Sequence, residues 1–201
     1  MFILGLTGSI GMGKSVTARL FAEAGVPVHD ADATVHRLYE GEAVPLIEAA
    51  FPGTTSDGKV DRTKLAARVL GDDAAIERLE RIVHPLVREA EQRFLAEAGT
   101  RGAPVVVLDI PLLFETGGEK RVDAVVVVTA PPDLQRARAL ERPGMTEAKL
   151  DAILGKQMPD SEKRARAHFI VDSSRGLDSA RDQVRGILQA VAAIPGRTKS
   201  E

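Results

Sequence analysis

The fold of this chain is decided by a stretch near its N-terminus, Gly8-Ser9-Ile10-Gly11-Met12-Gly13-Lys14-Ser15. It matches the pattern G-x-x-x-x-G-K-[ST], in which glycines let successive backbone N–H groups turn into one concave nest for anions. The flanking residues supply the context that this motif needs, because Phe2 to Thr7 predicts a buried strand and Val16 to Ala24 continues as a helix. A glycine-rich turn without a ligand would explain the glycines alone. Strand, motif and helix together favour a phosphate-binding loop (P-loop).

Each part of this loop has a predicted task. The nest lies at a helix N-terminus, where free N–H groups and the helix dipole favour anions. Lys14 can reach the β- and γ-phosphates, and the Ser15 hydroxyl can bind Mg²⁺. The residues predicted to hold the phosphates are Gly8, Gly11, Met12, Gly13, Lys14, Ser15 and Val16. The sequence therefore predicts a protein that binds a nucleoside triphosphate.

Composition excludes several other classes. The chain has 201 residues, of which 44% are hydrophobic and 28% charged, and this is typical of a globular protein. A formal net charge of −2 argues against non-specific nucleic-acid binding. The sequence has no cysteine, no basic signal region and no apolar run long enough for a membrane span, so we expect a cytoplasmic protein. It also has no Asn, and therefore lacks the Asn-Lys-x-Asp element with which typical GTPases read guanine.

Two carboxylates follow the second predicted strand, Val26 to His29. Asp30 and Asp32 stand where the chain turns from strand to helix, and ligands of open α/β sheets bind at the carboxyl ends of strands. Each could bind a metal ion or act as a base, or could instead cap the helix predicted from Ala33 to Tyr39. We favour a functional role for Asp32 and leave both roles open for Asp30.

The region from 33 to 102 is predicted to be mostly helical. Its expected helices span Val44–Phe51, Arg62–Leu70 and Pro85–Ala98, and a further helix, capped by Asp72 or Asp73, is expected to run to about Val83. Ser56-Asp57-Gly58 is a turn signal, and Asp61 is placed to cap a helix. A boundary is expected at His84, because a residue before proline disfavours the helical conformation. The region is too long for a simple crossover, so we infer an inserted subdomain that holds a second substrate beside Asp32.

The third predicted strand, Val105 to Ile110, is a β-branched run typical of a strand buried on both faces. Asp109 lies near its end, where a carboxylate could reach Mg²⁺ directly or through water. An apolar loop with Leu112 follows, and beside a ligand such a loop would form a wall. Glu115 either binds a substrate hydroxyl or caps the turn at Thr116.

A fourth predicted strand, Val122 to Thr129, leads into a helical hairpin rich in arginine. Its first helix is expected to run through Arg142, and Thr146 could cap the second. One face of the first helix carries Gln135, Arg138 and Arg142 at i, i+3 and i+7. This is either a solvated basic face or a cationic lid over the triphosphate, and we favour the lid, with Arg138 as its first contact. A last strand (His168–Val171) and an amphipathic helix (Leu177–Ala193) complete the chain.

In this order and at these separations, the motifs resemble the dephospho-coenzyme A kinase family over nearly the whole chain. The matching pieces are Leu6–Ser15, Asp30–Asp32, His84–Leu86, Ile110–Glu115, Gln135 with Arg138 and Arg142, and Gln157–Pro159 with Lys163 and Arg164. The sequence departs from the family pattern at Ser173, where Asn is usual near the adenine, and at His168, where Asp is frequent.

The resemblance implies an α/β fold of the P-loop NTPase type, with three α/β/α layers around a parallel sheet, as in nucleoside-monophosphate kinases. It implies one domain built from a core, a helical substrate-binding insertion, a helical lid and a tail. The implied ranges are 1–32, 103–132 and 167–195 for the core, 33–102 for the insertion, 133–166 for the lid and 196–201 for the tail.

The implied activity is transfer of a phosphoryl group from ATP, with Mg²⁺, to the ribose 3′-hydroxyl of dephospho-coenzyme A, the last step of coenzyme A synthesis. Asp32 stands where the family has its catalytic base, and the other implied catalytic residues are Thr7, Lys14 and Arg138. The implied acceptor-binding residues are Asp32, His84, Arg88, Leu112 and Glu115. Ser15 and Asp109 are expected to hold the metal, and Arg142 the nucleotide. The expected partner is a small molecule, with neither nucleic acid nor membrane, and the expected state is a monomer or weak homo-oligomer.

Two other functions stay open on the sequence. Another small-molecule kinase of this fold would share every P-loop argument, and only the acceptor-side motifs separate it. A nucleotide-dependent switch would need no second substrate. The missing guanine-reading Asn and the pair Asp30 and Asp32 argue against the switch.

Overall fold

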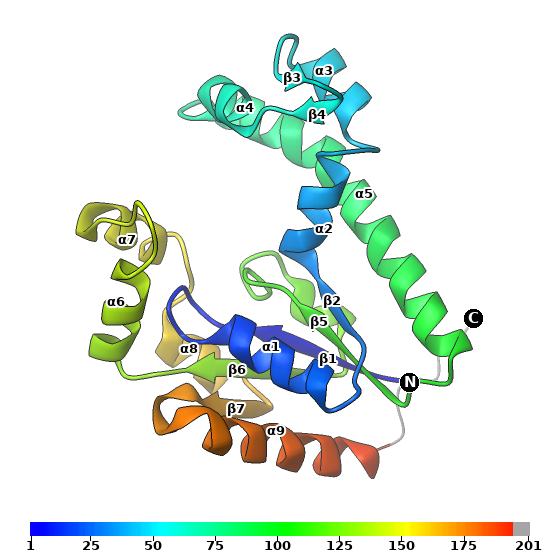
Figure 1. The fold of residues 1–201 in the computed structure, drawn as a ribbon, viewed down its shortest axis with the longest axis vertical. Coiled ribbons are helices and arrows are strands. Elements are labelled where there is room, and N and C mark those ends of the chain that lie inside the picture. The colour runs from blue at the N-terminus through cyan, green and yellow to red at the C-terminus, as the bar shows by residue number, and fades with distance from the viewer. Residues whose placement is uncertain (195–201) are drawn as a thin grey trace. The chain divides into compact units, whose positions relative to one another are not determined.

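The computed structural model describes residues 1–194, which form two compact units (Figure 1). The first unit contains residues 1–29 and the chain from residue 98 onward, and the second contains residues 30–97. The predicted tail and residue 195 lie outside the described residues. Among residues 1–194, no helix is long and apolar enough to cross a membrane.

A five-stranded sheet forms the centre of the first unit. Its strands are β1 (Phe2–Thr7), β2 (Val28–Asp30), β5 (Val105–Asp109), β6 (Ala124–Thr129) and β7 (Phe169–Asp172), in the order β2-β5-β1-β6-β7. β1 runs parallel to both β5 and β6, and β6 runs parallel to β7. Because parallel strands end at the same edge of a sheet, Thr7, Asp109 and Thr129 form one rim.

Helices α1 (Lys14–Glu23) and α9 (Gly176–Ala192) cover one face of this sheet, side by side (Figure 1). Leu4 and Leu6 of β1 share a buried cluster with Phe21 of α1 and Val184 of α9. On the other face, a Cβ at Gly5 would lie 2.9 Å from Leu113, so the loop after β5 packs directly on the strand. The alternation along β1 thus separates two layers, and the α/β class predicted from the sequence is confirmed.

Three further helices follow β6. α6 (Pro132–Leu140) and α7 (Glu147–Leu154) form a hairpin, in which Arg136 pairs with Glu147 and, at 2.9 Å, with Asp151. Thr146 accepts a hydrogen bond from the backbone of Lys149 and caps α7 as predicted. The expectation that α6 runs through Arg142 is wrong, because Pro143 disfavours a helical conformation at the residue before it. The short α8 (Asp160–Ala165) was not predicted.

The second unit is mostly helical. Its elements are α2 (Ala31–Leu38), α3 (Val44–Ala50), β3 (Thr55–Ser56), β4 (Lys59–Val60), α4 (Arg62–Val69) and most of α5 (Asp73–Thr100). A buried cluster that includes Leu38, Ile47, Leu65 and Val83 holds them together. The predicted turn is a β-hairpin whose central residues, Asp57 and Gly58, both have positive φ, as a type I′ turn requires.

The helix break expected at His84 does not occur. α5 continues for 28 residues with Pro85 in its interior. Such a proline removes one backbone hydrogen bond and costs about 3 kcal/mol. The helix retains packing on both sides of it, because Val83 belongs to the buried cluster and Leu86 packs against that cluster. Tertiary packing therefore outweighs the local preference.

Candidate active site

The P-loop is the start of the site, and its geometry leaves backbone N–H groups free for an anion. Gly11 and Gly13 have φ values of 80° and 90°, which few residues other than glycine adopt. α1 begins at Lys14, and Gly13, which precedes it, has no side chain to cap the helix. The first turn contains no acidic residue. The helix N-terminus is therefore suited to phosphate oxygens.

Close packing around the P-loop also requires glycine at positions 8 and 13. A Cβ at Gly8 would lie 2.8 Å from the backbone oxygen of Val128 in β6, and a Cβ at Gly13 would lie 3.0 Å from the Ser173 hydroxyl. The loop is thus pressed against the end of β6 and against the segment that follows β7. Met12 is buried, and its sulfur accepts a hydrogen bond from the backbone of Ala130.

The structure brings Lys14 and Asp109 together at the rim of the sheet. The Lys14 Nζ lies 2.6 Å from Asp109 Oδ1, and Asp109 is buried at the end of β5. Thr7, also buried, donates a hydrogen bond of 2.9 Å to the backbone oxygen of Pro111. This bond joins the end of β1, which leads into the P-loop, to the loop that follows Asp109 and β5.

The donors near the P-loop fit a magnesium ion. Ser15 is exposed in the first turn of α1, and Asp109 supplies a carboxylate at the neighbouring strand end. Among residues 1–194, no group of three or more His, Cys, Asp or Glu could hold a metal ion. Mg²⁺ does not need such a group, since it keeps several waters and is bound by one or two protein oxygens with substrate phosphates.

Arg138 of α6 lies against the P-loop through Ser173. Its guanidinium donates to the Ser173 hydroxyl at 2.8 Å and to the Ser173 backbone oxygen at 3.1 Å. The same hydroxyl donates to the backbone oxygen of Met12 at 2.8 Å. Ser173, one of the two positions that depart from the family pattern, thus connects Arg138 of α6 to Met12 of the P-loop. Arg142 and Val16 are both exposed.

Glu115 is engaged within the protein. Its Oε1 lies 2.9 Å from the Nζ of Lys163 and accepts a hydrogen bond of 2.8 Å from the backbone of Met158. Partial burial by itself raises the pKa of Glu115, but the ion pair with Lys163 and the hydrogen bond from the Met158 backbone outweigh it, and the net pKa is lowered. The expected cap at Thr116 is not made by Glu115, because the Thr116 N–H and hydroxyl both bond to the Leu112 oxygen.

The burial of Lys163 is not expected from the local sequence. Its side chain is 0% exposed, although it stands in a charged segment that is typical of a solvated helix. Only its place in the family motif pointed to it. In the loop after β5, Leu113 and Phe114 are buried and only Leu112 remains exposed as a candidate wall residue.

In the second unit, Asp30 and Asp32 have different roles. The Asp30 carboxylate accepts a hydrogen bond of 2.9 Å from the backbone of Ala33, so Asp30 caps α2. Asp32 lies in the first turn of the same helix and is exposed. The alternatives left open by the sequence therefore divide between the two residues: Asp30 is the cap, and Asp32 is the carboxylate available for chemistry.

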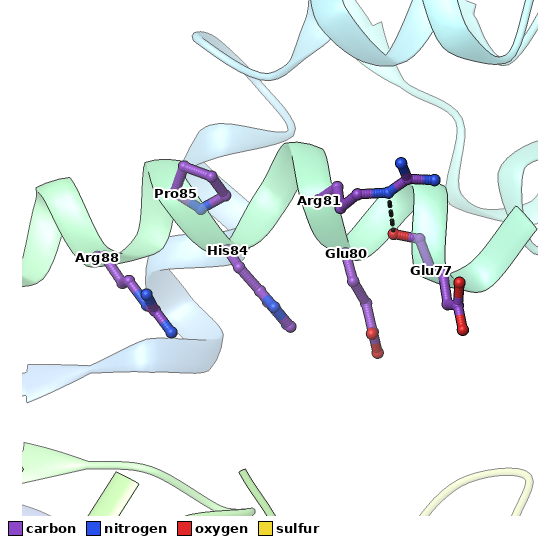
Figure 2. A pocket seen from close by; sticks show the side chains of 6 residues that line it. All are labelled: Glu77, Glu80, Arg81, His84, Pro85 and Arg88. Atoms are coloured by element: carbon purple, nitrogen blue, oxygen red, sulfur yellow. Dashed lines mark hydrogen bonds between the residues drawn. The ribbon is translucent and has the colours of Figure 1, made fainter. Parts of the chain in front are cut away.

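His84 and Arg88 lie one turn apart on α5 and are both exposed. Figure 2 shows them projecting to the same side of the helix as Glu80. They line a shallow groove of about 440 Å³ together with Glu77, Glu80, Arg81 and Pro85. The groove is charged and open, as a surface for a polar, extended ligand would be.

The fold and these contacts define a class. A P-loop between β1 and α1, a lysine–carboxylate pair at the rim of a parallel sheet and a helical hairpin that carries an arginine are the parts of a P-loop kinase. The sequence profile named "Dephospho-CoA kinase" matches residues 2–179. The chain belongs to the dephospho-CoA kinase family.

Individual relatives agree with this assignment. The chain is 68% identical to a dephospho-CoA kinase of Rhodopseudomonas palustris over 197 residues, which cover 98% of this chain and 99% of the relative. A Thermus thermophilus protein of known structure is 37% identical and superposes with a TM-score of 0.82 over 94% of this chain and 96% of that one. A Campylobacter jejuni dephospho-CoA kinase, 22% identical, has the same fold with a TM-score of 0.66 over 94% and 96% of the two chains.

Proposed function

We propose that the protein transfers the γ-phosphoryl group of ATP to the ribose 3′-hydroxyl of dephospho-coenzyme A, giving coenzyme A and ADP. Membership of the family supports the reaction. The observation in this chain that carries the proposal is the P-loop, with its uncapped helix start and with Lys14 directed to Asp109 at the rim of the sheet. These groups can hold a triphosphate at the end of β1.

The nucleotide side of the mechanism follows from the charges of this chain. The P-loop N–H groups and Lys14 bind the phosphates, and Arg138 stabilises the negative charge that develops during transfer. Ser15 and Asp109 would hold Mg²⁺, which neutralises phosphate charge when bound. Arg142, exposed beyond the end of α6, can join Arg138 in a lid that excludes water.

On the acceptor side, Asp32 accepts the proton of the attacking hydroxyl or orients that hydroxyl for in-line attack. Phosphoryl transfer has a loose transition state, so positioning contributes more than the basicity of the carboxylate. Asp32 suits this role because it is exposed and because Asp30 alone caps the helix. His84 and Arg88 bind the acceptor along α5, and Leu112 contributes an apolar contact.

We also propose a functional division of the chain, with residues 33–102 as the acceptor-binding insertion and 133–166 as the lid. The compactness of residues 30–97 supports the first part, and the α6–α7 hairpin supports the second. For Glu115 we propose an indirect contribution, because its Oε1 is bound to Lys163 and to the Met158 backbone.

ADP release in the presence of Mg-ATP tests the proposal against its alternatives. The acceptors to compare are dephospho-coenzyme A, the common nucleoside monophosphates and no acceptor. We expect turnover with dephospho-coenzyme A alone. Turnover with a monophosphate would assign the chain to another kinase of the same fold, and rapid ADP release without an acceptor would favour a nucleotide switch.

A further inference from the structure

Two glutamines, one near the start of the α6–α7 hairpin and one just after its end, bond to one residue of the P-loop. Gln135, in the first turns of α6, donates from Nε2 to the backbone oxygen of Ile10 at 2.8 Å. Gln157, three residues after the end of α7, accepts at Oε1 from the backbone N–H of Ile10 at 3.2 Å. Gln135 is separated from Ile10 by 125 residues and Gln157 by 147.

Chemistry fixes the direction of both bonds. A backbone N–H can only donate and a carbonyl oxygen can only accept, so one glutamine must present its oxygen and the other its nitrogen. A glutamine amide can serve as either, because it carries both an oxygen acceptor and N–H donors. Together the two side chains satisfy both backbone polar groups of Ile10, in the middle of the loop that receives the phosphates.

The first glutamine also packs tightly against the loop. Gln135 is buried, and its backbone oxygen occupies the place that a Cβ at Gly11 would take. The position of Gln157 is fixed by its neighbour. The backbone N–H of Met158 donates to Glu115, which pairs with the buried Lys163. Neither end of the lid can therefore move without changing the surroundings of Ile10.

We propose that Gln135 and Gln157 are positioning residues that clamp the P-loop to both ends of the α6–α7 hairpin of the lid. The clamp sets the shape of the phosphate nest and makes the lid respond when phosphates enter it. Arg138 lies about one turn after Gln135 on α6, so the helix that contacts the P-loop through Gln135 also positions Arg138. The inference rests on the proposed use of ATP but not on the identity of the acceptor.

The same substitution at both positions should give opposite results. Gln157→Glu keeps an acceptor for the Ile10 N–H, whereas Gln135→Glu places a carboxylate against the Ile10 carbonyl and removes the donor. Both add one negative charge beside Ile10, so repulsion of the phosphates is common to the two variants. Gln189→Glu, on the exposed surface of α9, is the control for the charge itself.

Titration with a non-hydrolysable ATP analogue and Mg²⁺, without acceptor, measures the effect. We expect Gln135→Glu to raise Kd about tenfold more than Gln157→Glu, since loss of the donor leaves the partly buried Ile10 carbonyl unsatisfied, which corresponds to roughly a 5- to 100-fold change. Gln157→Met should weaken binding and Gln157→Glu should restore most of it. This comparison stands even where Gln135→Glu fails to fold.

Hydrogen exchange supplies a readout that lost stability alone would not produce. In the unmodified protein, the analogue should slow exchange in α6 and α7 as well as in the P-loop. In Gln135→Met/Gln157→Met, saturating analogue should protect the P-loop only. Asp123→Asn, which weakens a side-chain bond to the Ile3 backbone at the amino edge of the sheet, controls for destabilisation.

Equal Kd values for the two glutamate variants would overturn the clamp, as would full protection of α6 and α7 in the double variant. Because no acceptor is present, a wrong acceptor assignment leaves this experiment unaffected. Failure of the unmodified protein to bind the analogue would instead overturn the proposed function, and the clamp with it.

Discussion

Asp30 and Asp32 are two residues apart, yet their carboxylates do different things. Asp30 holds the N–H of Ala33, and Asp32 is exposed beside it. If Asp32 orients or deprotonates the acceptor hydroxyl, Asp32→Asn should lower kcat by roughly 10²–10⁴. Steady-state kinetics with saturating dephospho-coenzyme A measure the fall, and nucleotide titration should show unchanged ATP affinity.

Asp30→Asn is the matched control, because Asn caps a helix about as well as Asp. Its kcat should stay within about twofold of the unmodified protein. A normal kcat in Asp32→Asn, or an equal loss in both variants, would remove Asp32 from the mechanism.

Lys14 should contribute to both ATP binding and turnover. Lys14→Ala removes the cation that lies 2.6 Å from Asp109 and would otherwise meet the phosphates. We expect both weaker ATP binding and slower turnover, measured by fluorescent-nucleotide titration and by ADP release. An unchanged titration would contradict the assignment of the P-loop as the triphosphate site.

Residues with a strong motif could be predicted, and residues whose role depends on distant partners could not. The glycine pattern of the P-loop identifies Lys14 as a candidate site residue, and its place at the end of a predicted strand identifies Asp109. The burial of Lys163 depends on Glu115, 48 positions earlier, and the role of Ser173 depends on Met12 and Arg138. No local pattern encodes such pairs.

At the scale of elements, the P-loop and α6 are in contact through Gly11. Gly11→Ala should cost the strain of a positive φ, about 1–2 kcal/mol, plus the overlap of the new Cβ with the backbone oxygen of Gln135. Overpacking of this kind adds about 1–3 kcal/mol. Urea unfolding measures the total.

Gly25→Ala separates the two terms, since Gly25 has a φ of 83° but open space around its Cβ position. Gly25→Ala should lower the free energy of unfolding only by the strain of its positive φ. Equal losses for Gly11→Ala and Gly25→Ala would mean that α6 does not press on the loop.

Element boundaries show where sequence patterns fail. The run Phe2–Thr7 was predicted to the residue, because a buried strand before a P-loop has a clear start and end. The continuous α5 was not, because the preference against helix before Pro85 is local and the packing of Val83 and Leu86 is not. For the hairpin of β3 and β4, the sequence predicts the turn but not the two-residue strands on either side of it.

The pair Glu115 and Lys163 contributes to the stability of the whole molecule in a pH-dependent way. The folded-state pKa of Glu115 is lowered, so its carboxylate stabilises the fold above the unfolded pKa of about 4.3, and this contribution is lost as pH falls through the folded value. Glu115→Gln should therefore lower Tm at pH 7, and the gap from the unmodified protein should narrow as pH falls below about 4.3 toward the folded-state pKa. Thermal melts from pH 3.5 to 7.5 measure the difference, and a gap that stayed constant with pH would contradict it.

For the whole molecule, the sequence predicts five strands as short runs, and the family resemblance of the ordered motifs implies the α/β class and the parallel sheet. The order of the strands could not, because pairing of β1 with both β5 and β6 joins segments about 100 residues apart. The boundary of the second unit, residues 30–97, depends on contacts that the periodicity of single helices does not contain.

The proposed reaction phosphorylates one hydroxyl of one acceptor, the ribose 3′-hydroxyl of dephospho-coenzyme A. The most direct measurement is phosphorus NMR and mass spectrometry of the product formed from dephospho-coenzyme A and Mg-ATP. We expect stoichiometric ADP and a product with a single new phosphomonoester on the ribose 3′-oxygen, identical to coenzyme A. A phosphate at another position, or ADP without a phosphorylated acceptor, would contradict it.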